Sequence, residues 1–128
     1  RQSVRIGRHT LVADEPKSVG GDDTGPSPYD LLLAGLGACT SMTLRMYADR
    51  KGWDLGDVAV HVSHAKIHAE DCAECADKKV KIDTFNRTVE VTAEISEEQK
   101  SKLLEIADKC PVHRTLEASS RIETKMKE

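Results

Sequence analysis

The stretch that decides the fold runs from Ser27 to Gly52 and reads SPYDLLLAGLGACTSMTLRMYADRKG. Ser27 can cap a helix, Pro28 suits the first helical position, and Asp30 stands where the second member of a capping box is expected. Gly52 can adopt the left-handed conformation in which helices commonly end. The pattern therefore predicts one helix from about Pro28 to Lys51, roughly 36 Å long at ~1.5 Å per residue.

The two halves of this expected helix differ in polarity. Residues 31–39 are apolar on every side, which predicts that this half is buried all round. The second half carries charges and is predicted to emerge into solvent. The charged residues are Arg45, Asp49, Arg50 and Lys51. Because charges are rare inside membrane-spanning helices, we do not expect this helix to cross a membrane.

Shorter periodic segments surround the long helix. Alternation of apolar and polar residues predicts strands at 4–12, 58–62, 85–95 and 122–126. The two middle strands are expected to pair as a hairpin around residues 70–81. Ser96 and Gln99 form a second capping box, which opens a helix that reaches Cys110, where Pro111 breaks or restarts it. The order β, long α, ββ, α, short α, β predicts an α+β fold, with an antiparallel sheet packed on the long central helix.

Size and composition narrow the functional classes. At 128 residues, the chain is expected to be a single domain spanning residues 1–128, and its start on a strand-like segment is consistent with further residues upstream. The formal net charge of −3 and the interspersed charges do not suggest a nucleic-acid partner. The sequence contains no recognisable signal peptide. A small domain of this kind with four cysteines is most simply cytoplasmic, where thiols stay reduced.

Two cysteines far apart in the sequence lie in the expected helices, one within a helix and one at a helix end. Cys39 lies in the long helix, and Cys110 lies at the end of the next one. A lone helical cysteine commonly acts as a small apolar side chain, and this is one interpretation of each. The other is a thiol that reacts and a thiol that resolves it. Reaction requires a thiolate, and therefore a cation or a helix N-terminus nearby.

A second pair, Cys72 and Cys75, lies in the expected hairpin loop. A Cys-x-x-Cys is half of a zinc site, and His64, His68 or a partner chain could complete it. The pair could also be an accessory dithiol, or two ordinary surface thiols. A zinc-binding regulatory protein built on Cys72 and Cys75 is therefore one functional hypothesis.

Several short motifs occur in order along nearly the whole chain. They are Asp14-Glu15-Pro16, Gly20-Gly21, GPSPYDLL at 25–32, Gly37-Ala38-Cys39-Thr40 and Cys110-Pro111. Together they resemble the OsmC/Ohr family of thiol peroxidases. The segments 42–53, 67–72 and 106–116 resemble its branch of OsmC-like redox proteins.

This resemblance implies an intertwined homodimer with active sites at the subunit interface, and the reduction of organic hydroperoxides without a cofactor. By position, Cys39 would be the peroxidatic cysteine, which forms a sulfenic acid, and Cys110 the resolving cysteine, which condenses with it to a disulfide. Leu32, Leu36 and Met42 would form an apolar wall suited to an alkyl hydroperoxide. Dihydrolipoamide or a related dithiol would reduce the disulfide.

The chain departs from the family pattern beside the expected site. Well-studied hydroperoxide reductases have a glutamate directly after the proline that opens the long helix, where this chain has Tyr29 followed by Asp30. Their activating arginine would fall before residue 1, and Arg5 and Arg8 are the nearest candidates. Asp14, Glu15 or Asp30 could orient such an arginine, and Asp30 could instead simply cap the helix. These departures favour one further hypothesis, an OsmC-like protein that binds a lipid-like small molecule without catalysis.

Overall fold

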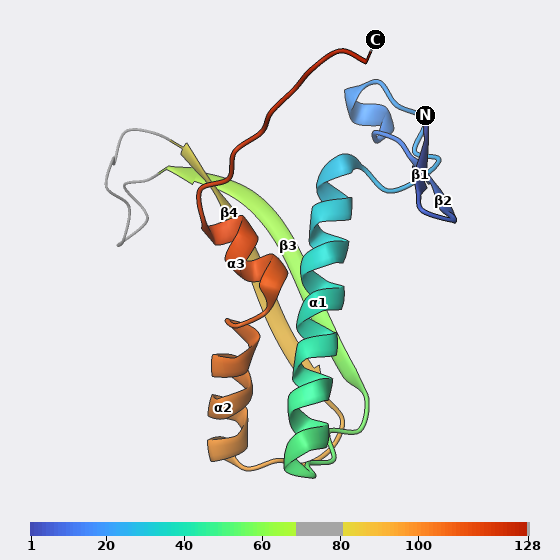
Figure 1. Ribbon diagram of the computed structural model, residues 1–128. Helices are drawn as coiled ribbons and strands as arrows, with labels where there is room; N and C mark the ends of the chain where they lie inside the picture. The colour runs from blue at the N-terminus through green and yellow to red at the C-terminus, as the bar shows by residue number, and fades with distance from the viewer. Residues whose placement is uncertain (69–80, 128) are drawn as a thin grey trace. The chain divides into compact units, whose positions relative to one another are not determined.

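The computed structural model describes residues 1–68 and 81–127. Its elements are β1 (Gln2–Ile6), β2 (His9–Ala13), the 3₁₀ turn η1 (Lys17–Val19), α1 (Pro28–Lys51), β3 (Val58–His68), β4 (Lys81–Val91), α2 (Glu97–Ala107) and α3 (Pro111–Glu117) (Figure 1). The strands form two small antiparallel sheets, β1–β2 and β3–β4. One long helix, two shorter ones and two sheets make this an α+β fold, as the sequence predicts.

The first predicted strand is in fact a hairpin. β1 and β2 pair antiparallel, from Gln2 opposite Ala13 to Ile6 opposite His9. Gly7 lies in the turn with φ 60°, a left-handed conformation that glycine adopts without steric cost. The prediction of one continuous strand over 4–12 is therefore wrong, because alternation alone does not register a two-residue turn.

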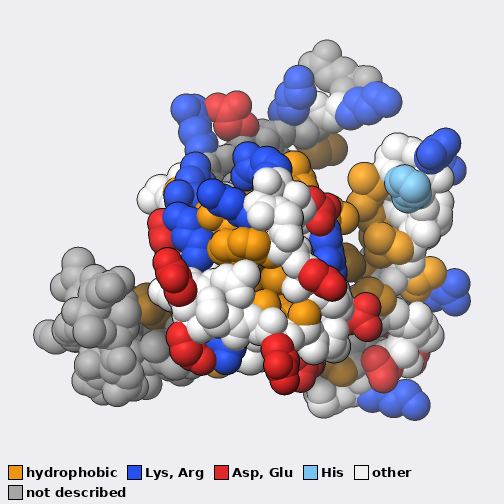
Figure 2. Space-filling view, turned by 90° about the horizontal axis from the view of Figure 1, so that it is seen from below, with side chains coloured by type: hydrophobic (Ala, Val, Ile, Leu, Met, Phe, Trp, Pro, Cys, Tyr) orange, Lys and Arg blue, Asp and Glu red, His pale blue; other side chains and the backbone are white. Residues whose placement is uncertain are grey.

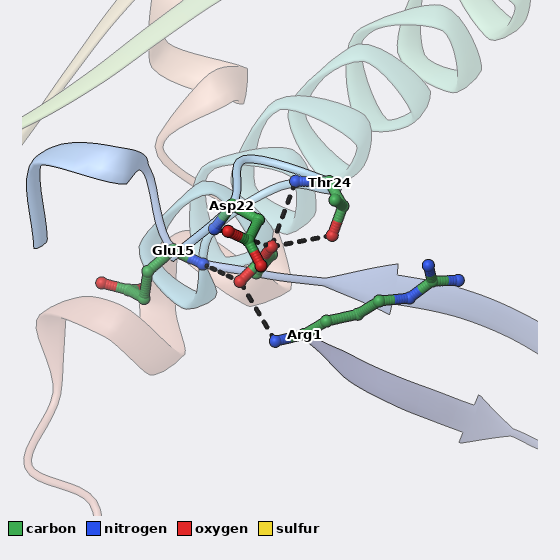
Figure 3. A network of polar contacts seen from close by, with 5 residues as sticks. Arg1, Glu15, Asp22 and Thr24 are labelled. Atoms are coloured by element: carbon green, nitrogen blue, oxygen red, sulfur yellow. Dashed lines mark hydrogen bonds and ion pairs between the residues drawn. The ribbon is translucent and has the colours of Figure 1, made fainter. Parts of the chain in front are cut away.

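The loop between β2 and α1 is organised around one carboxylate, Asp14 (Figure 3). Its Oδ2 accepts hydrogen bonds from the Thr24 hydroxyl at 2.7 Å and from the backbone amides of Asp22 and Thr24 at 3.2 Å each. Its Oδ1 accepts from the Glu15 amide at 2.9 Å and lies 3.2 Å from the amino group of Arg1. These hydrogen bonds, the Thr24 hydroxyl first, hold the pKa of Asp14 well below its usual range.

The ends of α1 follow the predicted caps. Ser27 and Asp30 form the reciprocal pair, with the Ser27 amide donating to Asp30 Oδ2 at 3.0 Å and the Asp30 amide donating to Ser27 Oγ at 3.1 Å. Gly52 has φ 69° and ends the helix after Lys51. The helix over Pro28–Lys51 is confirmed.

The chain divides into two compact units, Arg1–Gly37 with His61–Thr88, and Ala38–Val60 with Val89–Glu128. In the first unit, Tyr29 at the start of α1 stacks on the His64 ring, with 4.6 Å between centroids. His64 also contacts the Phe85 ring, at 5.0 Å, and its Nε2 lies 2.8 Å from Asp83 Oδ1. Gly37 faces Val62, whose side chain would be in ordinary contact with an added Cβ. In this unit the start of α1 therefore packs on β3 and β4.

The second unit contains the hydrophobic core. Its buried members are Leu44, Tyr47, Ala48, Leu55, Leu103, Ile106 and Ala107. The second half of α1 contributes three of these, although its charged residues Asp49, Arg50 and Lys51 are exposed. The prediction that this half emerges into solvent is wrong for one face, because residues three and four apart share one side of a helix.

The first half of α1 is also less buried than predicted. Leu36 is only 3% exposed, but Leu32 is 43% exposed. Further along the helix, Met42 and Met46 are 67% and 68% exposed. The prediction of burial on every side is wrong, because the described residues cover only part of the helix surface.

Three boundaries of the middle strands and one whole predicted strand also differ from the structure, since β3 continues to His68 rather than 62 and β4 spans Lys81–Val91 rather than 85–95. β4 ends at Val91, and the chain continues with the Thr92 amide donating to the Asp57 carbonyl at 3.1 Å. Asp57 directly follows a tight turn at Gly56, which has φ 65°. The predicted strand at 122–126 is absent, since this segment has no regular structure and no neighbouring strand among the described residues. The alternation of Ile122 and Met126 with polar residues therefore lies on an exposed segment.

Of the described helices, α1 is the one long and apolar enough to cross a membrane by length and composition. Core helices of soluble proteins meet the same criterion, and α1 contributes to a hydrophobic core. Figure 2 shows acidic and basic side chains interspersed with apolar ones. This surface agrees with the mixed charge pattern of the sequence.

Candidate functional site

The second unit brings the two helix cysteines together. Cys39 lies on α1 and is partly exposed, whereas Cys110 is fully buried just before α3. Both are free thiols, and each lies close enough to the other to shift its pKa. Two neighbouring thiols can form a disulfide if they are oxidised.

The break between α2 and α3 places Cys110 inside the unit. α2 ends at Ala107, and the amides of Lys109 and Cys110 close the last turn on the carbonyls of Ile106 and Ala107, at 2.9 and 3.2 Å. Pro111 occupies the first turn of α3 and disfavours a helical conformation at the residue before it. Cys110 accordingly has ψ 130°. The backbone changes direction at Cys110. The buried side chains of α2, Leu103, Ile106 and Ala107, keep the preceding turn in the core.

Hydrogen-bond donors surround each sulfur. The Thr40 hydroxyl and the backbone amides of Val112 and His113 interact with Cys110, while the Val112 amide and the Thr43 hydroxyl interact with Cys39. Cys110 makes no short capping hydrogen bond to α3, so the amide contacts are weak ones, as expected for a sulfur acceptor. Thr40 is completely buried, so its hydroxyl is held beside the thiol pair.

The two thiols differ in acidity. Burial raises the pKa of Cys110, but hydrogen bonds from Cys39, His113, Thr40 and Val112 outweigh it, and the net direction is downward. The pKa of Cys39 is raised, first by burial and then by its hydrogen bond to Cys110 and the charge that Cys110 carries when ionised. The hydrogen bonds of this pair therefore favour ionisation of Cys110 over ionisation of Cys39.

Within the second unit, no cationic side chain is among the causes of the two pKa shifts. Arg5 lies on β1 and Arg8 in the following turn, both exposed and both in the first unit. Within the second unit, Arg45 donates to the Gly56 carbonyl at 2.7 Å, and the His113 ring lies 3.2 Å from the Glu117 carboxylate. The largest influences on both thiols are burial and hydrogen bonds.

The other predicted site residues have distinct environments. Asp30 caps α1, as the simpler interpretation proposed, and Tyr29 stacks on His64. Leu32 and Leu36 belong to the first unit, whereas Met42 lies one helical turn after Cys39 in the second and is largely exposed. In the described part of the chain, Met42 is thus the predicted wall residue that shares a unit with the thiols.

The Cys72 and Cys75 pair lies outside the described residues, as does the side chain of His68. His64 is engaged with Asp83 at 2.8 Å. Within residues 1–68 and 81–127, no group of three or more histidine, cysteine, aspartate or glutamate side chains could hold a metal ion. The zinc hypothesis therefore stays a prediction.

Sequence reasoning missed the two threonines beside the thiols. Thr40 and Thr43 follow Cys39 at the next position and one turn later, and the helix directs each hydroxyl to a different sulfur. A threonine in a helix is ordinarily explained by a hydrogen bond to its own backbone. The hydroxyl residues directly after Cys39, namely Thr40, Ser41 and Thr43, were the sequence feature that could have predicted these contacts.

Comparison with known proteins agrees with this fold. A family model described as OsmC-like protein matches residues 20–125. This chain therefore belongs to the OsmC-like family. Comparison with curated proteins gives no sequence match.

Solved structures with the same fold have low sequence identity. An OsmC-like protein of Mycoplasma pneumoniae is 21% identical with a TM-score of 0.70, covering 90% of this chain and 77% of its own. The organic hydroperoxide resistance protein OsmC of Legionella pneumophila is 20% identical with a TM-score of 0.64, covering 86% and 75%. An OsmC-like hydroperoxide resistance protein of a Jannaschia species is 22% identical with a TM-score of 0.60, covering 84% and 70%. At these identities the likeness establishes the fold.

Proposed function

We propose that this protein is a thiol-dependent peroxidase that reduces organic hydroperoxides with Cys39 and Cys110. The contact between the two thiols carries the proposal, because neither sulfur alone can complete the reaction. Membership of the OsmC-like family supports it, and so do the structural neighbours named hydroperoxide resistance proteins.

The proposed chemistry begins at the more accessible sulfur. Cys39, as thiolate, attacks one peroxide oxygen, the O–O bond breaks, and an alcohol leaves while Cys39 becomes a sulfenic acid. Cys110 then attacks the Cys39 sulfur and expels water, giving a disulfide. Overall, two thiols and one hydroperoxide give one disulfide, one alcohol and one water. An external dithiol closes the cycle by reducing the disulfide.

The surroundings of Cys39 favour an apolar peroxide. Met42 is exposed one turn away, and α1 contributes an apolar surface rather than a charged one at this point. We further propose that the protein is cytoplasmic and works as a homodimer. The exposed apolar side chains Met42, Met46 and Leu104 of the second unit support an association with another copy.

A single-turnover reaction tests this proposal directly. Protein with Cys72→Ser and Cys75→Ser is reduced, freed of reductant and mixed with cumene hydroperoxide. We expect the loss of two thiols per chain, one alcohol per hydroperoxide and a Cys39–Cys110 disulfide identified by peptide mapping. Cys110→Ser should stop at the Cys39 sulfenic acid, and Cys39→Ser should not react. Retention of both thiols would remove the proposal.

A binding protein without catalysis is the second candidate, because the pKa of Cys39 is raised rather than lowered. It predicts an unreactive Cys39 together with saturable binding of a fluorescent fatty acid. Binding that persists in Cys39→Ser, with no peroxide consumption by the unaltered chain, would favour this candidate.

A further inference from the structure

We propose that a cavity at the end of α1 binds a short apolar peptide with free ends, a zwitterion whose ammonium and carboxylate are joined by an apolar body. The cavity volume is about 610 Å³, which is within the range of small-molecule pockets and larger than a single amino acid. Its lining includes residues from the end of α1 and from α2, namely Tyr47, Lys51, Trp53, Glu98, Lys102 and Glu105. All of them belong to the second unit. The two thiols do not line this cavity, so the proposal is independent of the peroxidase function.

The cavity lies between two helices that share one hydrophobic core. α2 lies beside the second half of α1 (Figure 1), and buried residues of both helices pack together. Tyr47 and Lys51 are four residues apart and therefore share one face of α1. Glu98, Lys102 and Glu105 share one face of α2 by the same spacing. Core packing of the two helices therefore holds the walls of the cavity in place.

Two aromatic rings form the apolar part of the wall. Tyr47 and Trp53 meet edge to face, with 5.5 Å between their centroids and 74° between their planes. Tyr47 belongs to the core and Trp53 packs against it. The chain has one tryptophan, two tyrosines and one phenylalanine, so half of its aromatic residues line this cavity. These rings offer an apolar ligand a contact surface in a chain whose core is otherwise aliphatic.

The charged groups of the walls are balanced in number and only partly paired. Lys102 and Glu105 pair with each other on α2 at 3.4 Å. Lys51 on α1 and Glu98 on α2 have no ion-pair partner among the described residues. The cavity therefore presents one uncompensated positive charge and one uncompensated negative charge, each from a different helix.

Lys51 places the positive charge beside the aromatic wall. Its Nζ lies 5.7 Å from the centroid of the Tyr47 ring, within the range of a cation–π contact. A ligand carboxylate that pairs with this ammonium brings the adjoining apolar body over the rings. The Glu98 carboxylate on the α2 wall then accepts the ligand ammonium.

A zwitterion matches this cavity better than a simple ion does. An anion would pair with Lys51 but place its charge in the same cavity as Glu98, and a cation would meet the reverse conflict. Both side chains are exposed, and exposed ion pairs are individually weak. Recognition therefore requires a ligand that satisfies both charges and also covers the aromatic wall.

The test uses Trp53 fluorescence, because Trp53 is the one tryptophan of the sequence. L-leucyl-L-leucine, which does not absorb in this range, is titrated together with two analogues. N-acetyl-leucyl-leucine lacks the ammonium, and leucyl-leucinamide lacks the carboxylate. We expect saturable binding of the dipeptide and about fivefold weaker binding of each analogue. Equal or tighter binding of either analogue overturns the proposal, as does the absence of saturation up to about 10 mM by both fluorescence and calorimetry.

Two variants at exposed positions assign each charge to its partner. Lys51→Met should weaken dipeptide binding about fivefold without affecting leucyl-leucinamide, because that analogue has no carboxylate to lose a partner. Glu98→Gln should weaken dipeptide binding similarly without affecting N-acetyl-leucyl-leucine. The matched controls are Lys100→Met and Glu97→Gln, which change the same charges on α2 outside the cavity and should leave all three affinities unchanged. Equal effects of a cavity variant on all three ligands, or effects of the controls as large as those of the cavity variants, would refute this assignment.

Discussion

Oxidation of the Cys39–Cys110 pair is expected to stabilise the protein strongly. A disulfide between these residues closes a loop of about 72 residues, and restricting the unfolded chain to that extent is worth up to about 4 kcal/mol in the loop-entropy model. The two thiols already contact each other in the reduced protein, so bond formation requires little rearrangement of the native state. The full gain is expected only if the native geometry accepts the bond without strain.

The assay compares guanidinium unfolding of the reduced and oxidised protein. Replacing Cys72 and Cys75 by serine leaves one possible disulfide, which diamide forms and a phosphine reductant removes. An increase of about 4 kcal/mol corresponds to a rise in melting temperature of more than about 10 °C for a domain of this size. The variant with Cys39→Ser and Cys110→Ser serves as the control and should not respond to diamide.

Equal stability of the two forms, or a less stable oxidised form, would refute this reasoning. It would mean that the sulfurs touch in a geometry that cannot accept a disulfide bond without strain. The proposed catalytic cycle would then lack a feasible resolving step.

Three further changes address the fold. Leu44→Ala removes a fully buried core side chain and should cost about 3 kcal/mol in urea unfolding, whereas Asp49→Asn at an exposed position of the same helix should change the free energy of unfolding by less than about 0.5 kcal/mol. Asp14→Asn should destabilise the protein at neutral pH. Because the folded pKa of Asp14 is lowered, its contribution is present above the unfolded value of about 3.9 and is lost as the pH falls below it, so wild type and variant should converge in acid unfolding curves. Ser96→Ala removes the capping box of α2 and should cost about 1 kcal/mol by thermal unfolding, compared with little change for Ser101→Ala on the exposed middle of α2; equal effects of the two would count against the cap.

The starts of α1 and α2 and the end of α1 could be predicted because they depend on groups a few residues apart, whereas α2 was expected to reach Cys110 and ends at Ala107. The pairs Ser27 with Asp30 and Ser96 with Gln99 make the expected reciprocal hydrogen bonds, and Gly52 ends α1 in the expected conformation. Short-range backbone chemistry of this kind is the same in any surroundings. The family resemblance was likewise readable from motifs in order.

Burial could not be predicted in the same way. Residues 31–39 contain almost no polar side chain, yet Leu36 is buried and Leu32 is largely exposed. The alternating pattern at 122–126 was equally strand-like, but the described chain offers it no neighbouring strand. The apolar composition shows which side chains would be stabilised by burial. Whether they are buried depends on which distant segments pack against them in the tertiary structure.

The chain thus carries, in its local order of residues, the long helix, its caps and the two cysteine motifs. The contact between Cys39 and Cys110, and the Thr40 hydroxyl beside it, arise only when α1 packs against the segment that joins α2 to α3. The pKa values of the two thiols also depend on the tertiary structure, because burial and neighbouring hydrogen-bond donors shift a thiol from its ordinary pKa. Packing brings the hydrogen-bond donors to the buried sulfur and so lowers the pKa of Cys110, which the spacing of residues along the chain does not determine.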